Sequence, residues 1–287
     1  MAKIAVELEQ ALAHRKLNGG PGSPTTRLLA QGDGWTVEDV ICTSGPRDRA
    51  FEEEHSRIAI AIVAAGTFQY RSTRGRELMT PGSLMLGTPG QCFECGHDHG
   101  AGDRCLSFGY TPEYWETLAG GAKFDALRLP PLRALSRVIA KACAGLTKEI
   151  AWEELSVELA AQTLQLVTDS PAPNPHPSAE ARVTRVVRAI EHNQTAAHTL
   201  TALASQAKLS PFHFLRLFEQ VTGVTPHQFI LRTRLREAAQ RLYEPARILD
   251  IALESGFGDL SNFNRTFRSE FGVTPRVWRK NNFTAMR

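Results

Sequence analysis

One short segment of the sequence carries most of its capacity for metal or thiol chemistry. Residues 92–105 read Cys-Phe-Glu-Cys-Gly-His-Asp-His-Gly-Ala-Gly-Asp-Arg-Cys and hold three of the five cysteines and two of the nine histidines. Zinc binds four thiolate, imidazole or carboxylate ligands in a tetrahedron, and a Cys-x2-Cys pair followed by histidine supplies such ligands. The candidate metal ligands are therefore Cys92, Cys95, His97, His99 and Cys105.

Three interpretations of this segment stay open. On a strand, Cys95, His97 and His99 would share one face because side chains alternate, and Cys105 would return on the neighbouring strand after a turn at residues 100–102. That geometry favours a zinc site, structural or sensory, and no other cofactor is predicted. The thiols could instead sense oxidants or electrophiles, or the segment could be a polar loop with ordinary cysteines.

The composition is typical of a cytoplasmic protein with two domains. A chain of 287 residues is long for one hydrophobic core. No apolar run approaches the roughly 20 residues of a membrane-spanning helix, and the charged N-terminal stretch does not resemble a secretory signal. Five cysteines are an odd set, so disulfides are not expected, and Cys42 and Cys143 are predicted to be buried small apolar side chains.

The charge of the chain changes sign at a proline-rich stretch. From residue 183 onward there are 15 Lys and Arg against 8 Asp and Glu, a net +7, and the remainder has 18 against 22, a net −4. Residues 171–177 contain four prolines, which exclude a helix interior or a central strand. This pattern predicts a first domain at 1–167, a linker at 168–180 and a basic domain at 181–287 that binds a polyanion.

The first domain is predicted to be a β-barrel followed by helices. Between residues 26 and 110, short runs of β-branched and aromatic residues, such as 35–44 and 57–72, alternate with Gly and Pro turns. From Pro112 onward the apolar residues recur at helical spacing. The last of these helices, at 155–167, either packs against the barrel or forms a dimer interface.

The second domain contains one motif twice. Residues 214–226 and 263–275 share Phe, Arg, Phe, Gly and Pro at positions 49 residues apart. Each copy reads as a helix, a tight turn and a second helix that begins at Ser210 or Asp259, which is the pattern of a helix-turn-helix unit. A long helix at 226–243, with its arginines largely outward, would space the two units for successive major-groove segments of double-stranded DNA.

The second helix of each unit offers one face to DNA. Its two phenylalanines lie four residues apart and must face the core, so the opposite face is exposed. Arginine can hold guanine in a fork and asparagine can hold adenine, whereas contacts to phosphate only position the protein. A solvated helical face is the alternative. The candidate DNA-binding residues are Phe212, His213, Arg216, Ser261, Asn262, Arg265 and Arg268.

The second copy, residues 251–275, closely resembles the signature of the AraC/XylS family of transcription regulators, and the resemblance covers roughly residues 183–283. It implies an all-α domain of seven helices, with two helix-turn-helix units joined by a long helix. Many members also carry an N-terminal cupin-like barrel that binds an effector, followed by helices that dimerise. The resemblance therefore implies DNA, an effector, a second copy of the chain and RNA polymerase as partners. The family's base-facing positions fall on Phe212, Arg216, Ser261, Asn262 and Arg265.

Two alternatives come from the enzyme class. Residues 75–82 are similar to a cupin turn, but the ligand set His-x-His with a later Glu is not visible around His55, which disfavours a cupin metalloenzyme fused to a DNA-binding module. A repair protein whose thiols accept alkyl groups is the other alternative. We expect a non-enzymatic regulator whose barrel senses an effector and whose two domains change their arrangement across the linker.

Overall fold

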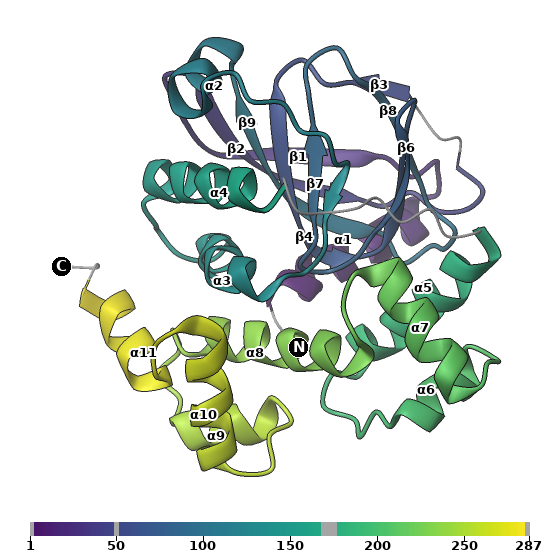
Figure 1. Cartoon of the computed structure of the whole chain (residues 1–287), viewed down its shortest axis with the longest axis vertical. Helices are drawn as coiled ribbons and strands as arrows, with labels where there is room; N and C mark the ends of the chain where they lie inside the picture. Colours follow the sequence, from purple (N-terminus) through teal and green to yellow (C-terminus); the bar gives the residue numbers. More distant parts are fainter. Residues whose placement is uncertain (1–2, 49–51, 168–176, 285–287) are drawn as a thin grey trace.

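The computed structural model describes residues 3–48, 52–167 and 177–284. A β-rich N-terminal body lies above an all-helical C-terminal body (Figure 1). Helix α1 (Lys3–Asn18) precedes the strands and lies beside them, with Leu8 buried. None of the described helices is long and apolar enough to cross a membrane.

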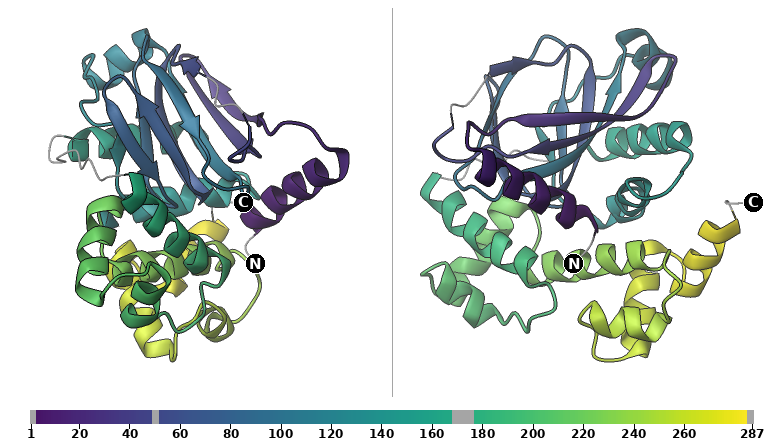
Figure 2. Two further views of the ribbon diagram at one scale, coloured as in Figure 1. Left: turned by 90° about the vertical axis from the view of Figure 1, so that its right-hand side faces the viewer. Right: turned by 180° about the vertical axis from the view of Figure 1, so that it is seen from behind.

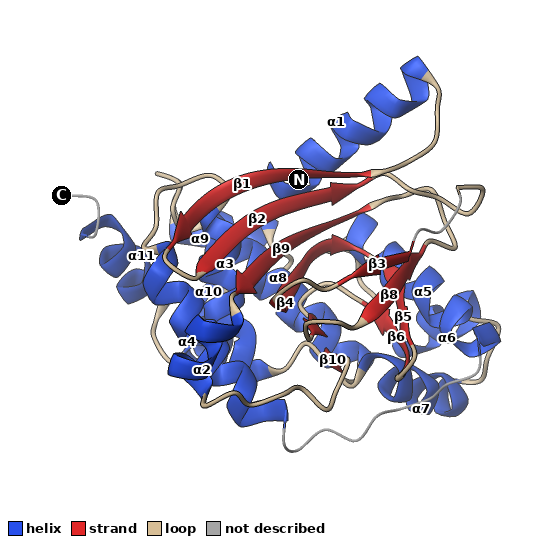
Figure 3. Ribbon diagram, turned by 90° about the horizontal axis from the view of Figure 1, so that it is seen from above, coloured by secondary structure: helices blue, strands red, loops and turns tan. Residues whose placement is uncertain are grey.

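Two antiparallel sheets face each other in the N-terminal body (Figure 3). The larger has the order β1-β2-β9-β4-β7-β10 and the smaller the order β3-β8-β5-β6. The predicted cupin-like barrel is thus confirmed as two facing sheets. Among the described strands, no backbone hydrogen-bond ladder joins the two sheets into a closed barrel. The strands are β1 (Pro24–Gly32), β2 (Trp35–Cys42), β3 (Glu52–Glu54), β4 (Ile58–Gly66), β5 (Phe68–Ser72), β6 (Gly75–Met79), β7 (Leu84–Gly87), β8 (Cys92–Gly96), β9 (Asp103–Tyr110) and β10 (Arg128–Leu129).

The alternation of side chains gives the larger sheet two different faces. Val37 of β2, Ile60 of β4 and Phe108 of β9 belong to the main core, which helices cover. The residues that alternate with them, such as Cys42 and Cys105, line the interior between the two sheets. Because successive side chains of a strand point to opposite faces, the same strands build both the core and the cavity.

Helices close the outer face of the larger sheet. They are α2 (Pro112–Ala119), the 3-10 turn η1 (Arg133–Leu135), α3 (Ser136–Gly145) and α4 (Trp152–Val167). The helix predicted at 155–167 is α4, and it buries Leu155 and Leu159 in the main core. Tyr110 of β9 donates a hydrogen bond to the Ser156 carbonyl of α4 at 2.8 Å. Packing on the sheet therefore accounts for the apolar face of α4.

The C-terminal body contains the predicted pair of helix-turn-helix units (Figure 1). Asp259 and Ser210 accept backbone hydrogen bonds at the N-termini of the two second helices, and Gly223 and Gly272 end those helices at φ of 77° and 76°. Left-handed φ values of this kind favour glycine. The helices are α5 (Pro177–His192), α6 (Leu200–Gln206), α7 (Pro211–Thr222), α8 (Pro226–Arg241), α9 (Ile248–Glu254), α10 (Leu260–Phe271) and α11 (Pro275–Thr284).

Only part of the predicted linker at 168–180 belongs to the described residues. Its residues 168–176 lie outside the described residues, and α5 begins at Pro177, so the last four linker positions are helical. A proline is well tolerated in the first turn of a helix, where its missing N–H has no partner to lose. The helical body therefore begins a few residues earlier than the sequence predicted.

Each helix-turn-helix unit has its own core, and each core takes one residue from the N-terminal body. Leu78 of β6 joins the first core, which α5–α8 build around Phe214 and Phe218. Ala140 of α3 joins the second core, built around Phe263 and Phe267. In both views of Figure 2 the helical body lies directly below the β-rich body.

Candidate DNA interface and ligand-binding cavity

The recognition helices α7 and α10 have the predicted division between buried and exposed faces. Their four phenylalanines, Phe214, Phe218, Phe263 and Phe267, are 0% exposed. All seven candidate DNA-binding residues are exposed, and Phe212 is 64% exposed, which is unusual for a large apolar side chain. The helical periodicity of the sequence is sufficient to place these faces.

The exposed residues are partly ordered by their neighbours. The Arg216 guanidinium lies over the Phe212 ring, 5.8 Å from its centroid. Arg265 donates to the Asn262 side-chain oxygen at 3.2 Å, and the backbone N–H of Asn262 donates to Asp259 at 2.7 Å. Such exposed contacts are weak enough to be exchanged for contacts to bases or phosphates.

Residues of the N-terminal body form hydrogen bonds with both helix-turn-helix units, at α7 and at α10. Arg128 of β10 donates to the Val221 and Thr222 carbonyls at the end of α7, each at 3.1 Å, and to Glu77 at 2.9 Å. Buried carbonyl groups at a helix end need such partners. The end of α7 is therefore bound to the sheet on the side away from its exposed face.

The second unit is held in the same way through Glu270 of α10. Glu270 accepts hydrogen bonds from Arg232 of α8, at 3.1 Å, and from Ser136 of α3. Arg133 donates to the Ser269 carbonyl next to it. One carboxylate thus joins α10, the connector helix α8 and the N-terminal body.

The arginines of α8 were expected to face largely outward, but none of the four is fully exposed, and three of them bind backbone carbonyls. Arg232 and Arg234 are half-buried, and Arg236 is 8% exposed. A guanidinium carries five donors, which suits it to satisfy several carbonyls in a crowded place. These arginines therefore serve packing rather than contact with DNA. The carbonyls that they reach are those of Pro81, Pro131, Gln194, Ala196 and Gly256.

The structure does not bring the five predicted metal ligands together. Cys92 is exposed, while Cys95 and Cys105 line the cavity between the sheets. The predicted hairpin is absent among the described strands, because β8 pairs with β3 and β5 whereas β9 pairs with β2 and β4. The segment at 97–102 crosses from one sheet to the other, so Cys95 and Cys105 approach from opposite sides.

His97 and His99 are also separated. His97 continues the inward face of β8 and lines the cavity with Cys95. His99 lies beyond the end of β8, bonds the Thr67 hydroxyl at 2.6 Å and faces a second cavity. The alternation that would have placed both on one face applies only within a strand, and β8 ends at Gly96.

A different group of ligand-type side chains does come together. Donor atoms of Cys42, His97 and Asp103 all lie within 4.8 Å of one another, and all three residues are buried. His97 Nε2 is 2.6 Å from Asp103 Oδ2, and Cys42 faces Asp103 directly across the β2–β9 ladder. Cys42 was predicted to be merely a buried apolar residue. The signal that finds it is its even position on β2, shared with the inward-facing Glu38 and Val40.

The environment of these thiols disfavours a role as reactive nucleophiles. Burial raises the pKa of the Cys95 and Cys105 thiols, and the nearby Asp103 carboxylate raises them further. Thiols of this kind are poor nucleophiles. Burial opposes the charging of His97, but its hydrogen bonds to Asp103 and Cys42 raise its pKa to about 10.

The cavity between the sheets has a volume of about 460 Å³. Four carboxylates line it, those of Glu38, Glu53, Glu54 and Asp103, against two cationic groups among the described residues, the Arg57 guanidinium and the His97 imidazole. A cavity lined by one sign of charge attracts ions of the other sign. Its electrostatics therefore suit a cationic ligand.

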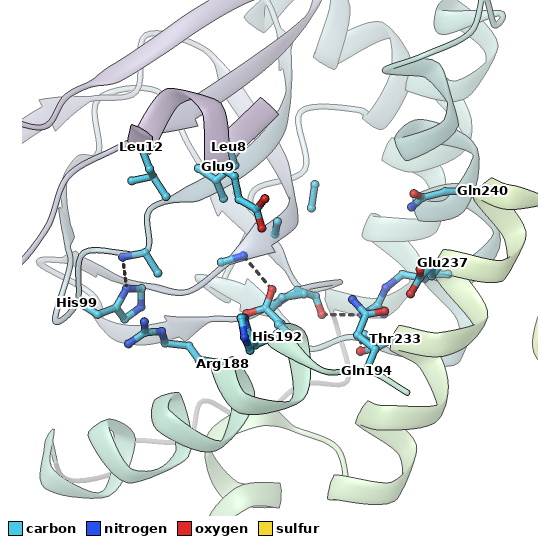
Figure 4. A pocket seen from close by; sticks show the side chains of 17 residues that line it. Leu8, Glu9, Leu12, His99, Arg188, His192, Gln194, Thr233, Glu237 and Gln240 are labelled. Carbon is cyan, nitrogen blue, oxygen red and sulfur yellow. Dashed lines mark hydrogen bonds between the residues drawn. The ribbon is translucent and has the colours of Figure 1, made fainter. Parts of the chain in front are cut away.

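A second cavity, of about 360 Å³, lies between the two bodies (Figure 4). Helix α1 and the end of β4 line one side, and α5 and α8 line the other. The Gly66 N–H donates to the Glu191 carboxylate of α5 at 3.0 Å at its edge. Arg188 and His99 lie next to each other at one edge of this cavity in Figure 4. Residues of both bodies therefore form the walls of this cavity.

Family models match both bodies of the chain. A model described as an AraC-like ligand binding domain matches residues 38–212, and one described as a helix-turn-helix domain matches residues 203–281. The chain belongs to the AraC/XylS family of transcription regulators. As an AraC-type regulator it has an N-terminal ligand-binding domain and a C-terminal DNA-binding domain.

The similarity of this AraC-type regulator to named relatives covers about a third of its chain. The chain is 40% identical over 93 residues to the Transposon Tn10 TetD protein of Escherichia coli, which covers 32% of this chain and 67% of that protein. It is 36% identical to the probable transcription factor PqrA of Proteus vulgaris, over 29% of this chain and 68% of the relative. It is 34% identical to the bifunctional transcriptional activator/DNA repair enzyme Ada of Escherichia coli, over 34% of this chain and 27% of Ada.

Solved structures of AraC-type proteins are also similar. A transcriptional regulator with an AraC-type DNA-binding domain from Chromobacterium violaceum is 29% identical and matches 37% of this chain and 95% of its own, with a TM-score of 0.34. ToxT from Vibrio cholerae is 12% identical and matches 86% of this chain and 98% of its own, with a TM-score of 0.35. The relatives are predominantly transcription regulators, so neither enzyme alternative is favoured.

Proposed function

We propose that this AraC-type regulator reads its operator with the exposed faces of α7 and α10. The observation that carries this proposal is the equivalence of the two faces. Each lies opposite a pair of buried phenylalanines, and each presents an exposed arginine, Arg216 or Arg265, at the same place in the repeated motif. The residues proposed to contact DNA are Phe212, His213, Arg216, Ser261, Asn262, Arg265 and Arg268.

Within this proposal the N-terminal body is a non-enzymatic sensor. Its effector changes how firmly the two bodies are docked, and the docked contacts decide how α7 and α10 are presented to DNA. Such control requires that the effector bind one arrangement more tightly than the other. In this proposal the linker between the two domains ends where α5 begins, at Pro177. We further propose that the regulator acts as a cytoplasmic homodimer and contacts RNA polymerase.

Substitution of the two arginines tests the DNA contacts. Arg216→Ala and Arg265→Ala should each weaken operator binding by about 1–3 kcal/mol if they form bidentate contacts to bases. The matched control is Arg47→Ala, which removes the same charge from an exposed position of the N-terminal body. Binding is measured by fluorescence anisotropy on an operator selected from random DNA. Unchanged binding by both recognition-helix variants would refute the assigned faces.

A further inference from the structure

We propose that Cys42, His97, Asp103 and Cys105 form a binding site for a thiophilic divalent cation, with zinc as the first probe. The site lies inside the ligand-binding domain, where β2 and β9 meet the loop that follows β8. The proposal rests on the sensor function proposed above and gives that sensor a class of ligand. It does not depend on which residues contact DNA.

The donor atoms are already close to coordination geometry. His97 Nε2 lies 2.6 Å from Asp103 Oδ2, and Cys42 Sγ lies within 4.8 Å of both ligands. Cys105 Sγ lies 4.0 Å from the other Asp103 oxygen. Metal–ligand bonds of about 2.0–2.3 Å place tetrahedral ligand atoms roughly 3.3–3.8 Å apart. The donor atoms of Cys42, His97 and Asp103 are therefore close enough to bind one ion, and we expect Cys105, which lies outside this group of three, to add the second sulfur after its side chain rotates.

The strand register explains why these residues meet. Cys42 is the last residue of β2 and Asp103 the first of β9, and the two are paired across the ladder. Cys105 follows Asp103 by two residues and shares its inward face. His97 arrives from the opposite sheet. An ion at this point would join both sheets at one end of the cavity.

The charge of the cavity suits a cation, and the sulfur ligands suit a soft or borderline metal ion such as zinc. The cavity carries more carboxylates than guanidinium groups, and both neighbouring sulfurs are shielded from solvent, as Cys42 is 6% and Cys105 7% exposed. Thiolate and imidazole ligands select zinc and similar metals over magnesium or calcium, which prefer oxygen. Cys95 lines the opposite wall of the same cavity, on β8 of the smaller sheet.

The site is connected to the cavity between the two bodies by a short loop. His97 and Asp103 stand at the two ends of residues 98–102, and His99 of this loop faces Arg188 of α5 (Figure 4). Gly102 lies against α1, since a Cβ there would meet Leu8 at 3.0 Å. An ion bound between His97 and Asp103 would move their donor atoms apart, from 2.6 Å to roughly 3.3–3.8 Å, and would thereby alter the contacts of this loop with α1 and α5.

Metal titration of the full-length, tag-free protein tests the proposal. The metal-free protein should bind one Zn²⁺ per chain in competition with a chromophoric chelator. Cys42→Ser and Cys105→Ser should each weaken this affinity at least tenfold, while Cys92→Ser, which changes an exposed cysteine outside the site, should leave it unchanged. Absence of stoichiometric binding by the wild type, or equal affinity in all variants, would overturn the proposal.

Cobalt provides a readout that needs no variant. Co²⁺ bound by two thiolates and an imidazole should give the thiolate-to-metal charge-transfer band and the intense visible bands of a tetrahedral complex. A spectrum of octahedral, oxygen-bound cobalt would overturn the assignment. Neither experiment contains DNA, so failure of the recognition-helix variants and failure of the metal site are distinguishable. Irreversible alkylation of Cys105 in metal-loaded protein would also count against the site.

Discussion

Arg236 of the connector helix α8 donates a hydrogen bond to the Pro81 carbonyl, in the turn between β6 and β7, at 3.2 Å. The approach is so close that a Cβ on the neighbouring Gly82, whose φ is +86°, would lie 2.4 Å from the Arg236 guanidinium. Burial lowers the pKa of Arg236 to about 10, so it is still charged at neutral pH. A buried cation thus anchors the DNA-binding domain on a turn of the ligand-binding domain.

Replacement of this anchor should loosen the docking of the two bodies. Arg236→Ala leaves the Pro81 carbonyl and the Thr233 hydroxyl without their donor, which costs about 1–3 kcal/mol. We expect a lower denaturation midpoint in urea and faster hydrogen exchange in the turn at 80–83. Arg137→Ala, at an exposed position of α3, is the matched control. Identical exchange in the turn for Arg236→Ala and the control would contradict the anchor.

The Glu191 contact predicts a pH dependence of stability. Burial raises the pKa of Glu191 from 4.5 to about 7, although the Gly66 N–H, Arg236 and Arg188 act to lower it. The folded state therefore keeps a proton that the unfolded state loses, and stability falls as pH rises from about 4.5 to about 7. Glu191→Gln keeps an acceptor for Gly66 but does not titrate.

We expect the melting temperature of Glu191→Gln to gain on that of the wild type as pH rises from about 5 to about 7.5. Differential scanning calorimetry across this range measures the difference. Because other groups titrate in both proteins alike, the difference between the two curves isolates Glu191. A difference that is constant with pH, or that grows on acidification, would be inconsistent with the raised pKa.

Two substitutions of Asp259, the cap of the second recognition helix, should affect stability and DNA affinity differently. Asp259 accepts the Asn262 N–H at 2.7 Å and is exposed beside the proposed DNA-binding face. Asp259→Ala should cost about 0.5–2 kcal/mol of stability, whereas Asp259→Asn keeps the cap and should cost little. The asparagine variant also removes a negative charge that repels phosphate, so its affinity for non-specific DNA should rise. Urea unfolding and anisotropy measure the two effects, and weaker DNA binding by Asp259→Asn would argue against this placement of the duplex.

The isolated helical domain tests where the basic charge acts. A fragment of residues 177–287 keeps α5–α11 and the exposed arginines, so it should bind DNA with an affinity that falls steeply as salt increases. It loses the contacts from Arg128 and Arg133, and its melting temperature should fall below that of this domain in the full chain. A folded fragment, verified by circular dichroism, without salt-dependent affinity would refute the assignment of DNA binding to this domain.

Much of the helical domain was predictable because its signals are local. The spacing of Phe214 and Phe218, the caps at Ser210 and Asp259 and the glycine at 272 act within one or two turns of a helix, and all are confirmed. Three arginines of α8 were misjudged because their partners come from distant parts of the chain. Helical periodicity cannot reveal a carbonyl at Pro81 that needs a donor.

The ligand set in the barrel was harder to predict for a related reason. Cys92 to Cys105 are close in sequence, but the chain crosses between sheets at residues 97–102, so nearness in sequence does not become nearness in space. Cys42 is more than 50 residues away from His97 and meets it only through the pairing of β2 with β9. Strand order sets this pairing, and a single sequence does not encode it in any local pattern.

The contribution of Leu78 and Ala140 to the two helix-turn-helix cores limits how such regulators can be recombined. A hybrid that joins this helical domain to an unrelated sensor would lack Leu78 and Ala140 and would therefore have a cavity in each core. A successful sensor swap must therefore bring matching residues on its own strand and helix, or carry β6 and α3 along with the helical domain. We therefore expect the ligand specificity of this protein to change by substitutions inside the barrel rather than by exchange of the whole barrel.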